Sequence, residues 1–582
     1  MPHRAHLFSL RLAHAFREAC IDERYTTARL GRDVMAGITV GIIAIPLAMA
    51  LAIASGVPPQ YGLYSAFIAG FVIALTGGSR FSVSGPTAAF VVILYPVAQT
   101  YGLGGLLLAS LMSGVLLIIM ALMRLGRFIE YIPEAVTLGF TGGIAVVIAT
   151  LQVKDFFGLE IVQMPEHYWD KLAVVGQAIP ELDAMATLVA VLTLSVMLLW
   201  PRLRTPVPPH LPAVVIGSLL ALVMNNNGAA IETIGSRFSY LMQDGSLAGG
   251  IPPFLPDFAW PWTRPGASGE ILGVSWSTVQ ELLPAAFAIA MLGAIESLLC
   301  AVVLDGMTGK RHSANSELLG QGIGNVIAPF FGGITATAAI ARSAANYRAG
   351  AESPVSAMVH ALVVLLALVS LAPLLAYLPM AAMAALLIMV AWNMSEAPKA
   401  LHLLKTAPRS DMLVFITCFS LTVLLDMVIA ITTGILLAAV LFTREMARMT
   451  RVTDITGGKR VAGSPLPDGW QVFKINGPLF FAAADRIFGE LAQLSASARG
   501  FILYMDGVTI LDAGGLSALN KLIDTCRQDG TQVVIADLQF QPLRTLARAG
   551  VTPEEGVVRF YPTLDEALSG ESSSRDVFQS RC

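Results

Sequence analysis

The residues that could do chemistry in this chain lie in two short polar stretches within otherwise apolar sequence. Residues 332–345 (GGITATAAIARSAA) place Arg342 among small residues. A cation inside a helical membrane bundle costs at least about 2.5 kcal/mol, so it usually faces a cavity and a partner. Residues 77–89 (GGSRFSVSGPTAA) repeat the order of a Gly pair, a polar extended run and a helix of small residues. Two broken helices at corresponding places in two halves of a chain indicate a ligand site.

The two stretches align without gaps when their Gly pairs are superposed, which places Pro86 on Ala341 and Thr87 on Arg342. A helix that starts at such a place has unpaired N–H groups and about half a positive charge in its first turn, so two facing helix starts form an anion site. Pro is tolerated in a first turn, and Thr and Ser offer hydroxyl groups. The predicted binding residues are Pro86, Thr87, Ala88, Glu296, Ala341, Arg342 and Ser343. The simpler interpretation is that Pro86 only kinks a helix and that Arg342 extends to the membrane surface.

Glu296 is the only acidic residue in the apolar run 282–304. Because apolar surroundings disfavour a charged carboxylate, a proton can bind and leave this side chain, which makes Glu296 a candidate for proton coupling. The alternative is a structural role, in which Glu296 is a hydrogen-bond partner of nearby backbone or of Arg342. The sequence leaves both interpretations open.

The elements that must position these residues are apolar helices. The chain is 55% hydrophobic and 13% charged, with a mean hydropathy of +0.69, which excludes an ordinary soluble protein and indicates a polytopic membrane protein. The expected segments are 33–55, 60–76, 86–100 (a half-helix), 103–123, 134–153, 183–200 and 208–226, then 282–304, 315–331, 340–349 (a second half-helix), 354–375, 379–394, 411–425 and 427–443. We therefore expect a transmembrane transport domain over 33–445, built from repeats at about 33–226 and 282–443.

The basic residues predict the orientation of these segments. Six arginines lie within residues 1–32, and such a basic flank stays in the cytoplasm, so 1–32 is expected to be a cytoplasmic N-terminal segment. Lys and Arg also gather in the later loops that alternation places inside, whereas the long loop 227–280 is poor in them and should face outward. Seven segments per half, an odd number, give the two repeats opposite orientations, which is the inverted 7+7 arrangement of many secondary transporters.

The composition changes after about residue 455, and 466–570 has the pattern of a small soluble α/β domain. Strands are expected at 470–476, 501–505 and 532–537, with helices at 513–528 and 542–549. Asp512 joins a strand to a helix and is expected to be its N-cap, with a ligand loop as the alternative. Residues 571–582, rich in Ser and charge, are expected to form a disordered tail. The five cysteines show neither paired spacing nor a metal-ligand pattern, and no nucleotide-binding motif is found. We therefore expect no cofactor, metal, catalytic residue or nucleic-acid partner.

Three stretches together are recognisable: SVSGPTAAF at 82–90, GGITATAAIARSAANYRAGA at 332–351, and the C-terminal domain with its DAGG turn. They resemble the SulP family of anion transporters, the bacterial relatives of the SLC26 carriers, over essentially the whole chain. The wording of 33–90 and 284–351, including GAIESLLCAVVLDGMTG, most resembles the enterobacterial carriers of C4-dicarboxylic acids.

This resemblance implies uptake of succinate, fumarate or aspartate across the bacterial inner membrane, with protons, by an elevator-like change between core and gate domains of a homodimer. It carries the family's functional positions onto Pro86, Glu296, Arg342 and Ser343. The C-terminal domain resembles a STAS domain, in which the phosphorylated Ser follows an Asp. Ala513 stands at that place, which weakens an expectation of phosphorylation switching.

Other functions remain open at this stage. A sulfate carrier or a Na⁺-coupled bicarbonate carrier would have the same fold, although Leu47 stands after Pro46 where many sulfate-carrying relatives have Gln. A sensor could instead signal anion occupancy through a cytoplasmic protein partner of the STAS domain. A uniporter or a channel is a further possibility. The repeated broken helices favour transport, because a sensor does not need an inverted repeat.

Overall fold

In the computed structural model of the chain, the described residues are 10–570 except 162–163, 166, 204, 206, 243–244, 426, 459–460, 462–465 and 495–497. The expected tail, 571–582, and the first nine residues of the N-terminal segment lie outside the described residues. The chain divides into two compact units, Met1–Ile435 and Leu436–Cys582, and each is described by itself.

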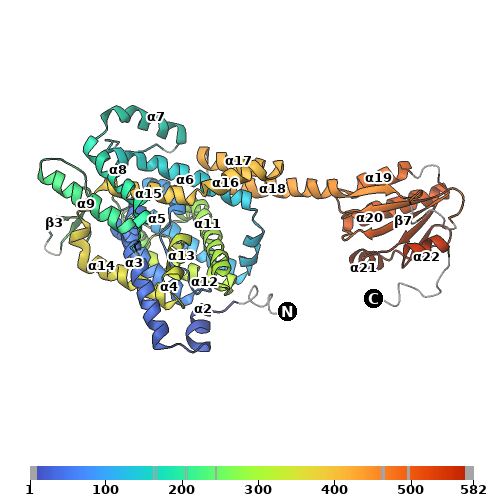
Figure 1. The fold of residues 1–582 in the computed structure, drawn as a ribbon, viewed down its shortest axis with the longest axis horizontal. Coiled ribbons are helices and arrows are strands. Elements are labelled where there is room, and N and C mark those ends of the chain that lie inside the picture. Colours follow the sequence, from blue (N-terminus) through green and yellow to red (C-terminus); the bar gives the residue numbers. More distant parts are fainter. Residues whose placement is uncertain are drawn as a thin grey trace. The chain divides into compact units, whose positions relative to one another are not determined.

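The first unit begins with a short N-terminal segment and a series of long apolar helices (Figure 1). The N-terminal segment contains α2 (His14–Phe16) and η2 (Arg17–Asp22). The elements of the first half are α3 (Thr27–Ala54), α4 (Pro59–Thr76), β1 (Ser84–Gly85), η3 (Ala88–Phe90), α5 (Val91–Leu122), η4 (Leu125–Tyr131), α6 (Glu134–Phe157), α7 (Tyr168–Ala178), η5 (Ile179–Glu181), α8 (Ala184–Leu199), η6 (Trp200–Leu203) and α9 (His210–Asn226).

A connection with little regular structure leads to the second half. It contains α10 (Ile234–Arg237), β2 (Ser239–Leu241), β3 (Leu247–Gly249) and η7 (Pro261–Thr263). The elements of the second half are α11 (Trp276–Thr308), α12 (Ala314–Ile327), η8 (Ala328–Phe331), β4 (Thr337–Ala338), α13 (Ile340–Arg348), α14 (Val355–Leu375), α15 (Met380–Met394), α16 (Ala397–Thr406), α17 (Arg409–Leu424) and α18 (Met427–Met449).

Each expected membrane segment overlaps a helix of the structure. The first half-helix and the segment after it are joined as α5, which has a non-helical break at Gly102 (φ 68°, ψ −165°). Among the described residues, nine helices are long and apolar enough to cross a membrane. The count of fourteen crossings stays a prediction, since α12 and α13 are short. Neither α7 nor α16 was predicted from the sequence.

The helices of the first unit pack in two groups. One group contains α3, α4, α5, α11, α12 and α14, and the other contains α6, α8, α9, α15 and α17. Helices far apart in the sequence lie side by side, such as the blue α3 and the yellow α14 in Figure 1. Glycines permit the closest approaches: a Cβ atom at Gly322 of α12 would lie 2.8 Å from the carbonyl oxygen of Gly114 of α5. Small residues at such interfaces are typical of membrane helices, because backbones can then touch.

The second unit holds a five-stranded sheet in the order β5-β6-β7-β8-β9. Its strands are β5 (Arg451–Asp454), β6 (Trp470–Asn476), β7 (Gly500–Gly507), β8 (Gln532–Ala536) and β9 (Val558–Tyr561). β5 pairs antiparallel with β6 and the others pair in parallel, with Leu503 opposite both Phe473 and Ile535. The central strand is apolar and buried along most of its length, as expected for a sheet that is covered on both faces.

Helices cover both faces of this sheet. They are α19 (Ala484–Leu494), α20 (Ala513–Asp529), α21 (Phe540–Arg548) and α22 (Leu564–Ser569). Side chains of α19, α20 and α21 form one apolar cluster with Phe473, Phe501 and Ile535. Side chains of α22 form a second cluster on the opposite face with Ile502 and Val534. The strands and helices that the sequence predicted in this unit are present, whereas β5, β9, α19 and α22 were not predicted.

Candidate functional site

The two polar stretches meet in a short antiparallel ladder between β1 and β4. Ser84 lies opposite Ala338, and Gly85 lies opposite Thr337. The ladder continues with a bond of 3.1 Å from the backbone N–H of Ala339 to the carbonyl oxygen of Val83. Because η3 and α13 begin directly after these strands, the ladder brings the two predicted helix starts together.

The gapless alignment of the two stretches is wrong at these helix starts. The N-cap of η3 is Thr87, and the N-cap of α13 is Ala339 rather than a residue at Arg342. The physical reason is a difference in length: nine positions separate Gly78 from Thr87, but only six separate Gly333 from Ala339. Arg342 therefore lies in the first turn of its helix and does not correspond to Thr87.

Arg342 is the only charged side chain of the predicted set that is buried at the helix starts, with 3% of its surface exposed. Its Nη2 donates a hydrogen bond of 2.8 Å to the carbonyl oxygen of Pro86. Its Nε and Nη1 atoms are buried and have no partner among the described residues. A guanidinium group with free donors in one plane matches the oxygens of a carboxylate or another oxyanion. The side chain does not extend to the membrane surface, as the simpler interpretation required.

Glu296 lies next to the start of the first half-helix. Its half-buried carboxylate accepts a hydrogen bond of 2.8 Å from Thr87 Oγ1. In the part of the chain that the structure describes, no ion pair joins Glu296 to Arg342. The hydroxyl group of Thr87 is thus directed to Glu296, and a change in the protonation of Glu296 would change which of the two groups donates.

The other predicted residues differ in their surroundings. Ser343 is fully buried, and its Oγ accepts a bond of 2.9 Å from the backbone N–H of Val83, so it supports the ladder. Pro86 and Ala88 are buried beside Thr87, whereas Ala341 is exposed. The structure therefore brings the whole predicted set to one place and divides it between an exposed side and a sealed side.

Side chains that the sequence analysis missed hold the second stretch. Asn325 binds both backbone groups of Ala336: its Nδ2 donates to the carbonyl oxygen at 2.9 Å and its Oδ1 accepts from the N–H at 2.8 Å. Gln321 donates to the same carbonyl oxygen at 3.1 Å, and Ser297 bonds with Thr337 at 2.7 Å. A signal was present, since Gln321 and Asn325 are amides one helical turn apart in an apolar, Gly-rich run.

The first stretch is held by charged groups instead. Glu317, which is 1% exposed, accepts bonds of 2.8 Å from the backbone N–H groups of Gly78 and Ser79. Arg80 forms ion pairs of 2.9 Å with Glu18 and 2.7 Å with Glu23 of the N-terminal segment. These contacts were not predicted, because they join residues that are far apart in the sequence.

In the second unit, Asp512 is the helix N-cap that the sequence predicted. Its Oδ1 accepts a bond of 2.8 Å from the N–H of Gly515, and its Oδ2 accepts one of 3.1 Å from the N–H of Phe481. The neighbouring Ala513 is exposed but has no hydroxyl group. These contacts give Asp512 a structural role.

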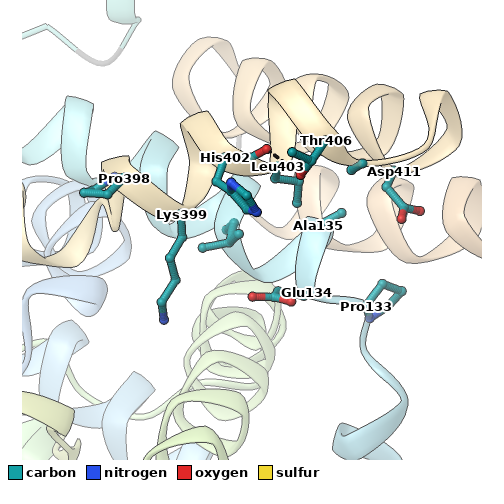
Figure 2. A pocket seen from close by; sticks show the side chains of 11 residues that line it. Pro133, Glu134, Ala135, Pro398, Lys399, His402, Leu403, Thr406 and Asp411 are labelled. Carbon is teal, nitrogen blue, oxygen red and sulfur yellow. Dashed lines mark hydrogen bonds between the residues drawn. The ribbon is translucent and has the colours of Figure 1, made fainter.

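A cavity of about 490 Å³ in the first unit lies between the start of α6, α16 and the start of α17. Figure 2 shows Glu134, Lys399, His402 and Asp411 around it. None of the predicted site residues lines this cavity. The predicted anion site is therefore a separate feature, built from the ladder and the two helix starts.

Comparisons with known proteins show which family the chain resembles. The family model described as Sulfate permease family matches residues 30–418, and the STAS domain model matches 465–567. YvdB of Bacillus subtilis, provisionally named a sulfate transporter, is 38% identical over 543 residues, which cover 93% of this chain and 98% of YvdB. The bicarbonate transporter BicA of Picosynechococcus sp. is 27% identical and covers 93% of this chain and 97% of its own.

Two solved structures are also similar. The transmembrane domain of a cyanobacterial BicA is 28% identical, has a TM-score of 0.60, and covers 70% of this chain and 98% of its own. SLC26A9 is 18% identical and has a TM-score of 0.79, covering 95% of this chain and 92% of its own. At that identity the second likeness concerns the fold alone.

Proposed function

Since the chain belongs to the sulfate permease (SulP/SLC26) family of anion transporters, we propose that it is a secondary active transporter of C4-dicarboxylates such as succinate, fumarate and aspartate, coupled to protons. The observation that carries this proposal is the buried guanidinium group of Arg342, whose Nε and Nη1 lack partners among the described residues beside two helix starts. A dicarboxylate supplies planar carboxylates for these donors. The sequence around 33–90 and 284–351 supports the same substrate class.

We propose that the bound anion has Arg342 as its charged partner. The residues proposed to surround it are Pro86, Thr87, Ala88, Ala341 and Ser343. The exposed Ala341 marks the side from which the anion would enter. The two packed helix groups support an elevator-like change of access, in which the group that holds the ladder moves against the other group.

The proton coupling is proposed to involve Glu296. Its carboxylate is bonded to Thr87 at the helix start, so protonation would alter the polar surroundings of the anion directly. A purely structural role remains the alternative, and the two differ in their effect on pH dependence.

The orientation proposed for the chain places both termini in the cytoplasm and the protein in a bacterial inner membrane. The gathering of Lys and Arg in alternate loops supports this orientation. A homodimer, and a cytoplasmic protein partner of the STAS domain, are proposed from the resemblance. A pull-down with the STAS domain would test the second of these.

A sulfate or bicarbonate carrier is the second candidate, because the similar proteins YvdB and BicA carry these names. Uptake of labelled succinate, sulfate and bicarbonate into proteoliposomes, with and without a proton gradient, separates the candidates. We expect gradient-driven succinate uptake. Uptake of sulfate or bicarbonate without succinate would overturn the dicarboxylate assignment and leave the anion site in place.

The coupling role is tested by Glu296→Gln, which keeps the size of the side chain and removes its titratable proton. We expect concentrative uptake to be lost while exchange of one anion for another persists. Uptake is normalised to the protein in the membrane and measured against pH. If acid still stimulated uptake by this variant as in the wild type, Glu296 would have no coupling role.

A further inference from the structure

A second titratable side chain lies on the sealed side of the anion site. His360 of α14 is fully buried, and the buried face of α14 also contains Ser356, Ala357 and Ala361. This face packs against the elements of the site: Ser356 accepts a bond of 2.9 Å from Asn346 of α13, and Ala357 clusters with Val83, next to β1. His360 lies on this same face, one turn after Ser356. It therefore lies in the layer where α14 packs against β1 and α13.

Several polar atoms in this layer have no partner among the described residues. They are both ring nitrogens of His360, the Oγ of Ser84, and the Nε and Nη1 of Arg342. The backbone of Ala357, one turn earlier in α14, lies near the imidazole. Buried polar atoms in native proteins almost always have partners, either protein groups or ordered water. Such a concentration of orphaned atoms points to a small polar site rather than to packed apolar core.

The positions of these groups are linked through β1. A Cβ atom at Gly85 would lie 2.7 Å from Arg342 Nη1, so the guanidinium group passes directly over this strand. A Cβ atom at Gly70 would lie 3.0 Å from the carbonyl oxygen of Ser84 and 3.9 Å from Cβ of Ala361. Ser84 is thus adjacent both to Arg342 and to the turn of α14 that carries His360, and the charge of Arg342 acts on the imidazole.

We propose that His360 is a proton-accepting residue of the anion site, and that it takes up a proton when a doubly charged anion binds to Arg342. Water molecules between Ser84, His360 and Arg342 would carry the proton and bond the orphaned atoms. The proposal rests on the proposed transport of an anion with two negative charges. It differs from the role of Glu296, which is half-buried and bonded to Thr87 at the start of the first half-helix.

The charges around His360 explain why proton binding to His360 and anion binding to Arg342 depend on each other. α13 contributes Arg342, β1 has no charged residue, and α4 contributes only Tyr61 and Tyr64, near Gly332. α3 contributes Asp33, which is bonded to the backbone of Glu352 and Ser353, with Arg29 and Arg32 at the same helix end. α11 contributes Glu296, bonded to Thr87, and the fully buried thiol of Cys300. Arg342 repels a second positive charge, and a bound dianion removes this repulsion.

Proton and anion then increase each other's affinity by the same factor, as thermodynamic linkage requires. An imidazole group is suited to this role, because its charge changes in the physiological pH range. For a singly charged anion, Arg342 alone neutralises the ligand and the effect on His360 is smaller. The proposal thus predicts stronger proton uptake with dianions than with monoanions.

The test is calorimetry of the purified full chain with succinate, in two buffers of different ionisation enthalpy between about pH 6 and pH 8. The buffer difference yields the number of protons taken up per bound succinate. For the wild type we expect uptake of up to about one proton, and an affinity that falls up to about tenfold per pH unit. For His360→Asn we expect this uptake and the pH dependence to decrease strongly while binding persists.

Two further variants serve as comparisons. His402→Asn removes an exposed histidine from the cavity of Figure 2 and should leave both quantities unchanged. Glu296→Gln should retain the part of the proton uptake that depends on His360. Proton uptake by His360→Asn equal to that of the wild type would overturn the proposal. A complete loss of proton uptake in Glu296→Gln, with none in His360→Asn, would also overturn it.

The remaining outcomes are also decisive. If the wild type bound sulfate but no succinate, the dicarboxylate assignment would fail, and the same comparison with sulfate, also a dianion, would decide on His360. If His360→Asn does not fold, His360→Gln is measured in its place. If neither variant folded, nitrogen-15 NMR of labelled histidines in the wild type would decide: a new imidazolium signal on adding succinate supports the proposal, and none contradicts it.

Discussion

The two broken stretches have the same architecture but are held by different chemistry. In the first, the backbone after the Gly pair is held by the carboxylate of Glu317 and by ion pairs of Arg80 with the N-terminal segment. In the second, it is held by the neutral side chains of Asn325, Gln321 and Ser297. These neutral supports add no carboxylate beside Arg342, and the nearby carboxylate of Glu296 is bonded to Thr87 and forms no ion pair with Arg342 among the described residues, so the charge of Arg342 is available to a ligand. The difference teaches that the fold repeats while the electrostatics do not.

The ends of the two stretches differ in the same sense. Before the first Gly pair, the carbonyl oxygen of Thr76 accepts a bond of 2.9 Å from the N–H of Ala13 in the ionic N-terminal segment. Before the second pair, the carbonyl oxygen of Phe330 accepts one of 2.8 Å from Ala259, beside a cluster of the rings of Phe258, Trp260 and Phe330. The contact before the first Gly pair therefore depends on charge, and the contact before the second Gly pair depends on aromatic packing.

The largest effect is expected from Arg342→Ala, which removes the one full positive charge of the second stretch. Loss of charge-assisted hydrogen bonds should weaken succinate binding by about 100-fold, while the protein still inserts. Arg342→Lys should restore binding only in part, because an ammonium group lacks the planar fork. Binding and uptake are measured at equal membrane abundance. Arg80→Ala, at the buried arginine of the first stretch, is the matched control and should retain binding; similar losses in both variants would refute the contrast.

Asn325→Ala should have the next largest effect, because it leaves the N–H of Ala336 without its side-chain partner and removes one of the two amide donors to the carbonyl oxygen of Ala336. Each buried group without a partner costs about 1–3 kcal/mol, so we expect a clearly lower unfolding temperature and weaker binding through displacement of β4. Thermal unfolding and succinate titration measure the two effects. Gln321→Ala, which loses one bond to the same carbonyl oxygen, should show a smaller change. Equal changes in both variants would argue against the special role of Asn325.

Gly85→Ala tests how closely the two stretches approach each other. The added Cβ atom would lie 2.7 Å from Arg342 Nη1, so the guanidinium group must move away from Pro86. We expect about tenfold weaker binding, equal to about 1.4 kcal/mol, with little loss of stability. Gly306→Ala is the control, because its Cβ atom would meet nothing within 4 Å. Unchanged affinity in Gly85→Ala would show that Arg342 need not be held at this strand.

The smallest effect concerns the ion pairs between the first stretch and the N-terminal segment. The hydrogen bond from Arg80 lowers the pKa of Glu23 from 4.5 to about 2. The stabilisation is therefore complete above the usual pKa of a Glu and is lost as the pH falls toward about 2. Because about a third of the Glu23 side chain is exposed to solvent, we expect it to contribute no more than about 1 kcal/mol. Hydrogen exchange of residues 13–23, corrected for intrinsic rates, should show protection that decreases below about pH 4.5.

Arg80→Gln is the matching variant for this prediction. It removes one ion-pair partner of both Glu18 and Glu23, whereas Glu23 keeps its contacts with Arg29 and Lys310. The protection of residues 13–23 should therefore be lower at neutral pH and should depend less on acid. Exchange in the segment next to the second stretch, around Ala259, should not change. An acid dependence in Arg80→Gln as strong as that of the wild type would assign it to groups other than the pair of Arg80 and Glu23.

The sequence by itself determined the elements and the charge of the site. Long apolar runs indicate membrane helices because the bilayer requires their length, Gly pairs mark where helices end, and Arg342 stands out because a cation is rare in such surroundings. In the second unit, the alternating strands and the capping Asp512 were also predictable. The strands β5 and β9 were missed, since each has only four residues. α19 was missed although Ile487, Phe488 and Leu491 recur at helical spacing.

Only the tertiary structure decided how these elements meet. The equivalence of Thr87 with Ala339 depends on the lengths of two extended runs, which a gapless alignment cannot measure. The bond between Thr87 and Glu296 joins positions 209 residues apart, and that between Arg342 and Pro86 joins positions 256 apart. Local propensity and periodicity contain no information at such separations. The free donors of Arg342 and the burial of His360 follow from packing alone, because a side chain acquires or lacks partners only when distant helices close around it.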